Sequence, residues 1–306
     1  MLKHTMITAA LLALLLTLGS QARAETPGRV VSVGGALTEI VFALGAEDRL
    51  VGVDSTSQWP EAATALPEVG YMRQLAAEGL LSLRPDLVLA TDAAGPEAVI
   101  EQLQTAGVEV RIVAAEPSLD GLLEKIRMVA AALDRQAVGE ALAESVAGAM
   151  CRVRDEIVRS PTQPRVVFLL SAARGAPLAA GRETAADAAI ALAGGVNPLA
   201  DMVGYKPLNA EALIATAPDL ILVGERTLAG LGGIDGMLAL PGVAATPAGA
   251  GRRIAAMNDL LLLGFGPRLP QAIAELAGHL HPDLDLGPAL VGTLAATPAP
   301  GATRQP

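Results

Sequence analysis

Cysteine, histidine and aromatic residues are scarce in this chain of 306 residues, which has one cysteine, three histidines, two tyrosines, three phenylalanines and one tryptophan. The single Cys151 excludes an internal disulfide. Because Cys151 follows the apolar spacing of an expected helix, we expect a core thiol rather than a nucleophile. The formal net charge of -10 gives no sign of a basic surface that would bind nucleic acid or an anionic membrane. We therefore expect no nucleic acid among the partners.

Residues that catalysis would need are also missing. Apart from His4, the only histidines are His279 and His281, where an expected helix ends and a cation is favourable. A zinc or manganese site needs clustered imidazoles, thiolates or carboxylates, so none is expected. Neither a Gly-x-Ser-x-Gly elbow nor a Ser-x-x-Lys motif occurs, and "GGALTE" lacks the Gly-x-Gly-x-x-Gly pattern and the lysine of phosphate loops. These absences favour binding over catalysis.

The first 24 residues predict a secretory signal peptide. Lys3 and His4 precede the apolar run "MITAALLALLLTLG", and the small residues Ala22 and Ala24 suit cleavage after Ala24. This run is short for a membrane span of roughly 20 residues, so an uncleaved anchor is the less favoured alternative. No cysteine lies near the cleavage site, which disfavours a lipoprotein. We expect an exported protein that acts in the periplasm.

An internal repeat organises the rest of the chain. An offset of 133 residues places "AEGLLSLRPDLVL" (77–89) on "AEALIATAPDLIL" (210–222), with 7 of 13 positions identical. Each copy predicts a short helix, a Pro-Asp stop and a buried parallel strand, and a Gly-Tyr pair precedes each copy. Strands alternate with helices around both copies, which predicts α/β structure with parallel sheets. Two similar Rossmann-like lobes follow.

One long helix is expected between the lobes. Val138, Leu142, Val146, Met150, Val153 and Ile157 recur at helical spacing, which predicts some 20 residues of helix, roughly 30 Å long. Such a helix can bridge two lobes and limit how far they swing. The expected order is a signal peptide (1–24), a first lobe (25–136), the inter-lobe helix (137–160), a second lobe (161–289) and a disordered tail (290–306).

Ligands of parallel α/β sheets bind beyond the carboxyl ends of the strands, so a cleft between the lobes is the expected site. The chain's only tryptophan, one tyrosine and several arginines lie in the loops expected there, which are 54–60, 70–73, 171–177 and 224–233. This concentration of residues predicts the ligand site.

The sequence resembles the periplasmic haem-binding proteins of bacterial haem ABC importers, on segments that include "RVVSVGGALTEIVFALGA", "DSTSQWP", "VGYMR", "GYKPLNAEALIATAPDLILV" and "LLLLGFGPR". The resemblance covers nearly the whole chain after the signal peptide. "VGYMR" and "LLLLGFGPR" are its specific parts, since the strand and helix patterns alone also fit cobalamin- and siderophore-binding relatives. It implies two Rossmann-like lobes joined by one long helix, and haem b as the transported ligand.

The resemblance implies that Tyr71 is the axial ligand of ferric haem iron. A phenolate is a hard anionic donor, and tyrosinate ligation of haem is known. Arg73 is expected to tune the ligand by placing a positive charge or a donor within ~4–6 Å of the phenolate oxygen. The alternative is that Tyr71 only packs under its loop, as its repeat counterpart Tyr205 could do. Tyr205 is expected to line the cleft without binding iron.

Three further residues are candidate haem contacts. Trp59 either stacks on the porphyrin edge or closes the core of the first lobe. Arg174 and Arg226 are expected either to pair with the haem propionates or to be solvated loop charges. Some family members supply a histidine from the second lobe, but "SAARGAP" has none, which implies five-coordinate haem or a weakly bound water.

The superfamily also implies partners. Acidic residues on each lobe dock onto permease arginines in this superfamily, and Glu78 and Glu211 occupy identical repeat positions; the alternative is that they favour helix N-termini. The implied partners are haem, the permease, its ATPase and, indirectly, an outer-membrane haem receptor. The predicted function is capture of haem for uptake, without enzyme activity. The alternatives are a binder of cobalamin or a ferric siderophore and, in another class, a haem-handling enzyme or a storage protein.

Overall fold

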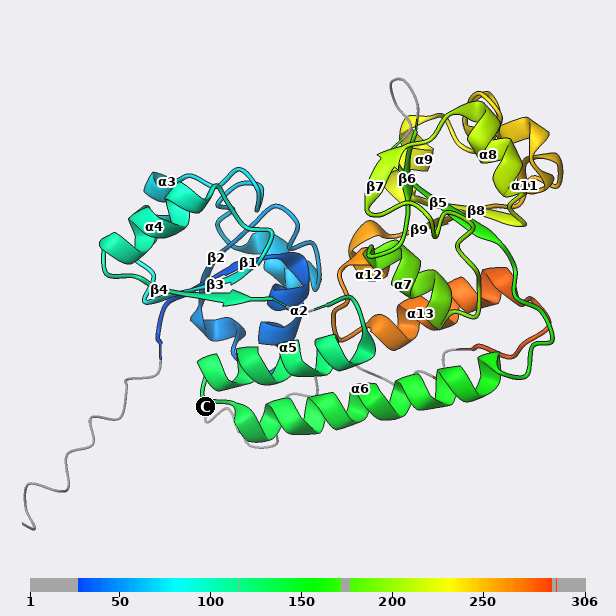
Figure 1. Ribbon diagram of the computed structural model, residues 1–306. Helices are drawn as coiled ribbons and strands as arrows, with labels where there is room; N and C mark the ends of the chain where they lie inside the picture. Colours follow the sequence, from blue (N-terminus) through cyan, green and yellow to red (C-terminus); the bar gives the residue numbers. More distant parts are fainter. Residues whose placement is uncertain (1–26, 115, 172–176, 288–289, 291–306) are drawn as a thin grey trace, which may run out of the picture.

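The computed structural model describes residues 27–114, 116–171, 177–287 and 290 (Figure 1). The expected signal peptide with its cleavage site, Arg174 and nearly all of the expected tail lie outside these residues. No helix in the described part of the chain is both long and apolar enough to cross a membrane.

The first lobe is a parallel sheet of four strands with helices on both faces (Figure 1). The strand order is β2-β1-β3-β4. Its elements are β1 (Val30–Val33), α2 (Gly35–Ala43), β2 (Leu50–Val53), α3 (Ala77–Ser82), β3 (Leu87–Thr91), α4 (Glu97–Thr105), β4 (Glu109–Val113) and α5 (Leu119–Ala132). Alternate residues of β1 point to opposite faces, and both sets are buried, Val30 toward α2 and α5 and Val31 toward α3 and α4. The continuous apolar runs of these strands therefore reflect burial on two faces.

The second lobe has a mixed sheet, with the order β7-β6-β5-β8-β9. Its elements are β5 (Val166–Ser171), β6 (Leu178–Ala180), α7 (Ala185–Leu192), β7 (Tyr205–Pro207), α8 (Ala210–Thr216), β8 (Leu220–Gly224), α9 (Glu225–Gly230), α10 (Ile234–Leu238), α11 (Pro247–Ala250), β9 (Ile254–Met257), α12 (Asp259–Leu263) and α13 (Leu269–Leu280). Strands β5, β8 and β9 are parallel, whereas β6 is antiparallel to β5 and β7 to β6. The expectation of a purely parallel second sheet is wrong, because the short connection after β5 leaves no room for a crossover helix.

Helix α6 (Gln136–Ile157) runs beneath both lobes (Figure 1). It packs against α5 of the first lobe and α13 of the second. One hydrophobic cluster passes from the first lobe through α5, α6 and α13 into the second. This continuous core is expected to hold the lobes in a defined relation, as the long helix predicts.

The buried stripe of α6 differs from the predicted one at its first turn. Val138 is 42% exposed, while Gly139 is buried. A Cβ at Gly139 would lie 2.3 Å from the Cβ of Ala130, so the close crossing of α5 and α6 requires a glycine there. Cys151 is exposed rather than in the core, because the stripe passes through its neighbour Met150.

The repeat is visible as matched hydrogen bonds in the two lobes. Arg29, before β1, donates to the backbone carbonyl that ends α3 at 2.7 Å, and its own backbone N–H donates to the Asp86 carboxylate at 2.9 Å. Arg165, before β5, donates to the carbonyl that ends α8 at 2.7 Å, and its N–H donates to Asp219 at 2.8 Å. Each Pro-Asp stop thus ties its helix to the first strand of its lobe.

Candidate functional site

A cavity of about 410 Å³ lies between the lobes. We call it the cleft. Its first-lobe wall consists of residues that end or follow the four strands of the first sheet, together with Lys125 of α5. Its second-lobe wall consists of Arg226, which follows β8, and residues of α12, which follows β9. The cleft therefore lies where parallel α/β sheets bind ligands, at the carboxyl ends of their strands.

A second, larger cavity of about 750 Å³ lies beside the end of α6. It lies apart from the predicted loops. His281 borders it and is buried, with Nδ1 2.9 Å from the Ser160 hydroxyl and Nε2 3.2 Å from the Ala193 carbonyl oxygen. Of these two cavities, the cleft is the one lined by predicted loops of both lobes, and we take it as the site.

Asp54 shapes the first-lobe wall of the cleft. Its carboxylate is 1% exposed and accepts hydrogen bonds from the Gly34 N–H at 2.8 Å, the Ser57 hydroxyl at 2.9 Å and the Thr56 hydroxyl at 2.7 Å. A carboxylate bound by several donors fixes the loops that carry them. The next residue, Ser55, donates its N–H to the Gly70 carbonyl at 2.9 Å. This hydrogen bond connects the Asp54 loop to the loop that carries Tyr71.

Tyr71 is the one aromatic residue among the described residues that line the cleft, and it is 40% exposed. Gly70 before it has a φ of +93°, which a residue with a Cβ rarely adopts. The Tyr71 carbonyl accepts from the Gln74 N–H at 2.8 Å, which closes the turn. The glycine and the turn together present the phenol at the cleft.

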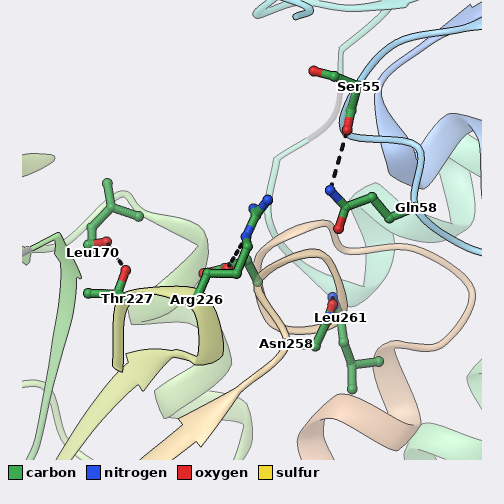
Figure 2. Close-up of polar contacts among 8 residues, drawn as sticks. Ser55, Gln58, Leu170, Arg226, Thr227, Asn258 and Leu261 are labelled. Atoms are coloured by element: carbon green, nitrogen blue, oxygen red, sulfur yellow. Dashed lines mark hydrogen bonds and ion pairs between the residues drawn. The ribbon is translucent and has the colours of Figure 1, made fainter. Parts of the chain in front are cut away.

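Arg226 lies on the opposite wall, at the start of α9. Figure 2 shows its guanidinium projecting from the second lobe toward the loop that carries Ser55 and Gln58. Its Nε lies 3.3 Å from the Asp259 carboxylate, and its side chain is 72% exposed. This arginine is thus accessible to a ligand, although Asp259 already offsets part of its charge.

Lys125 is the buried cation of the cleft, 9% exposed. Its Nζ lies 3.1 Å from the Phe265 carbonyl oxygen and 3.4 Å from that of Gly264, so it joins α5 to the second lobe. Burial lowers the pKa of the Lys125 ammonium to about 8, and the charges of Asp92 and Glu39 oppose this shift. The ammonium is thus poorly hydrated at the floor of the cleft.

A second contact between the lobes involves Glu39, Arg268 and Trp59. Two Arg268 nitrogens lie 2.6 and 3.0 Å from the two Glu39 oxygens, and the side chains are only 16% and 5% exposed. The Arg268 guanidinium lies 4.5 Å from the Trp59 ring centroid, a cation–π contact. Burial raises the pKa of the Glu39 carboxyl, and the hydrogen bonds and charge of Arg268 and the charge of Lys125 oppose the rise. We call these three residues the inter-lobe clamp.

The other predicted site residues lie outside the cleft lining. Trp59 is 48% exposed and stacks on Arg268, so it does not close the core of the first lobe, and a contact with the porphyrin edge stays a prediction. Tyr205 is half-buried against the core, with its phenol hydrogen-bonded at the N-terminus of α7 to the Thr184 side chain and the Ala186 backbone. Burial raises the pKa of the Tyr205 phenol, while these hydrogen bonds and the charge of Arg73 lower it.

Arg73 is exposed, and its charge acts on Tyr205 of the second lobe. Glu78 and Glu211 are exposed in the first turns of α3 and α8.

Sequence reasoning missed Lys125, Asp54 and the clamp partner Arg268. Lys125 interrupts an apolar helical stretch between Leu122 and Ile126, a signal that could have marked a buried lysine. Arg268 ends the "LLLLGFGPR" segment that carries part of the resemblance, but its carboxylate partner is 229 residues away.

Comparisons with known proteins agree with this architecture. The family model described as periplasmic binding protein matches residues 30–260. The periplasmic heme-binding protein RhuT from Roseiflexus sp. RS-1, in apo form, is 46% identical with a TM-score of 0.81, over 83% of this chain and 98% of that one. The periplasmic heme-binding protein BhuT in complex with two hemes is 44% identical with a TM-score of 0.79, over 87% and 99%. The vitamin B12-binding protein of Yersinia pestis is 31% identical over 70% of this chain and 74% of its own length.

Proposed function

The chain belongs to the periplasmic binding protein family, and we propose that it captures haem in the cleft and delivers it to an ABC permease. The observation that carries this proposal is the accessible Tyr71 phenol in a cavity between two lobes. Haem is the cargo rather than a cofactor. We further propose that residues 1–24 direct export and are removed after Ala24.

The residues of the cleft fit a ferric porphyrin. A phenolate is a hard anionic donor that suits ferric iron. Met72, Leu260 and Leu263 supply apolar wall for the ring faces, and about 410 Å³ falls within the range of roughly 300–1,000 Å³ typical of ligand pockets. We propose that Tyr71 binds the iron, that Arg73 tunes this ligand, and that Arg226 meets a propionate. Arg174 remains a candidate for the same role outside the described residues.

A corrinoid is the second candidate cargo, because vitamin B12-binding proteins are among the relatives. Titration of the purified mature protein, followed by visible absorption, separates the two. We expect haem to saturate at a fixed stoichiometry and to give the high-spin spectrum of tyrosinate ligation. Saturable binding of cobalamin or a ferric siderophore, with no saturable change on adding haem, would refute the haem proposal and leave only a transport receptor.

We also propose that Glu78 and Glu211 dock onto the permease. Helices α3 and α8, whose first turns carry Glu78 and Glu211, lie at the ends of the two lobes away from α6, on the same side of the molecule (Figure 1). Both are exposed, and neither belongs to the cleft lining. An exposed pair on matching helices suits a partner that contacts both lobes at once.

The double variant Glu78→Lys/Glu211→Lys is expected to bind haem as the wild type does. Like charges opposite the permease arginines would repel, so haem uptake by the permease in proteoliposomes is expected to fall more than tenfold. Glu124→Lys/Glu144→Lys, on α5 and α6, makes the same change in net charge away from α3 and α8 and serves as the control. Unchanged uptake by the Glu78/Glu211 variant would rule out this docking surface.

A further inference from the structure

Lys125 has a positive charge that the described residues leave without an ion-pair partner. Its two hydrogen bonds go to backbone carbonyls, at 3.1 and 3.4 Å, and no described carboxylate lies within ion-pair distance. A buried charge is costly unless it is paired, and burial accordingly lowers the pKa of this ammonium to about 8. The protein thus keeps a buried cation without a described ion-pair partner in the lining of its cleft, at a cost in stability.

The neighbouring charges do not satisfy it. Glu39 faces Lys125 from α2, but both of its oxygens are held by Arg268. Asp92, which follows β3, is exposed and acts only through its charge. On the opposite wall, Asp259 is paired with Arg226. No carboxylate in the described part of the chain forms an ion pair with Lys125, so the ammonium is open to an anion from a ligand.

We propose that Lys125 receives a carboxylate of the bound porphyrin, an inference that rests on the proposed function. Burial deprives the ammonium of hydrating water. A ligand carboxylate would replace that water with a charge-assisted hydrogen bond. Tyr71 and Lys125 together set two requirements for the cargo. It must contain an iron that accepts a phenolate, and it must carry a carboxylate at its periphery. Haem meets both, whereas the corrin ring of cobalamin carries neutral amides at its periphery. Lys125 thus selects between the two candidate cargoes.

The competing explanation is that Lys125 only fastens α5 to the second lobe. The two roles differ in what they demand of the ligand. A fastening lysine would affect haem and an esterified haem equally, whereas a carboxylate receptor distinguishes them.

The test compares haem with haem dimethyl ester on wild type, Lys125→Met and the control Arg127→Met. Arg127 lies on the same helix, is exposed and pairs with Glu140 at 2.8 Å, so the control removes one positive charge away from the cleft. We expect wild type and Arg127→Met to bind haem roughly 10- to 100-fold more tightly than the diester. In Lys125→Met this preference is expected to shrink to the part that Arg226 contributes, while the spectrum of Tyr71-ligated iron remains.

The pH dependence follows from the same pairing. A carboxylate raises the pKa of the ammonium above its value of about 8 in the free protein, so binding takes up a proton above that pH. The ratio of haem to diester affinity is expected to be constant below about pH 8 and to fall above it in wild type. In Lys125→Met the ratio is expected to stay flat.

Three outcomes overturn the inference. Equal binding of haem and its diester by wild type overturns it without any variant. A preference that is as large in Lys125→Met as in wild type also overturns it. Equal weakening of both ligands in Lys125→Met assigns the residue to fastening. Failure of the proposed function is distinguishable from these, because wild type would then show no saturable haem spectrum at all.

Discussion

Tyr71→Phe is expected to weaken haem binding by more than roughly a hundredfold and to abolish the tyrosinate spectrum. Removing a residue that only hydrogen-bonds to a metal ligand typically lowers metal affinity about 10- to 100-fold. This variant removes the proposed ligand itself. Phenylalanine keeps the ring, so the cleft wall formed by residues 71 and 72 should be undisturbed. Haem titration with visible absorption measures both the affinity and the coordination.

The matched control is Tyr205→Phe, at the corresponding repeat position. Its phenol is engaged at the N-terminus of α7 and lies outside the cleft lining, so this variant is expected to lose about 1 kcal/mol of stability and to bind haem normally. If Tyr71→Phe keeps the wild-type affinity and spectrum, another residue binds the iron. If Tyr205→Phe loses the spectrum instead, the ligand belongs to the second lobe.

Much of the fold is predictable because its signals are local. The Pro-Asp stops, the apolar runs of β3 and β8 and the spacing of α6 each lie within a short window, and the offset of the repeat follows from them. The mixed second sheet is not predictable in this way, since the direction of β6 depends on a hairpin within the lobe. The exposure of Val138 likewise depends on α5, which crosses too closely for a side chain at Gly139.

The candidate site likewise contains some residues that local sequence signals predict and others that they do not. Tyr71 lies in the loop that follows β2, and Arg226 lies at the start of α9, directly after β8. The rule that ligands bind at the carboxyl ends of strands is enough to bring both to the cleft. Tyr205 occupies a similar sequence position, yet its phenol turns to the helix N-terminus of its own lobe. Trp59 stacks on an arginine from the other lobe. Contacts between lobes have no local signature, which is why Lys125 and the inter-lobe clamp were not anticipated.

Arg268→Met is expected to lower the free energy of unfolding by about 3–5 kcal/mol at pH 8. The variant leaves the Glu39 carboxylate, 5% exposed, without its bidentate partner, and removal of one member of a buried ion pair costs about this much. Urea unfolding followed by circular dichroism measures the loss. Arg252→Met, which breaks an exposed pair with Asp235, is the control and should change stability by less than about 0.5 kcal/mol.

Two further measurements separate an unpaired charge from lost packing. In wild type, burial already raises the pKa of Glu39, and Arg268 opposes the rise, so its removal raises that pKa further. When a carboxyl has a higher pKa in the folded state than in the unfolded state, the protein loses stability as the pH rises through the folded-state pKa. The deficit of Arg268→Met should therefore be smaller at pH 5 than at pH 8. Glu39→Gln/Arg268→Met, which removes both charges, should recover most of the loss at pH 8. A deficit that is equal at both pH values and persists in the double variant would assign the clamp to packing, with the Trp59 stack as its main contact.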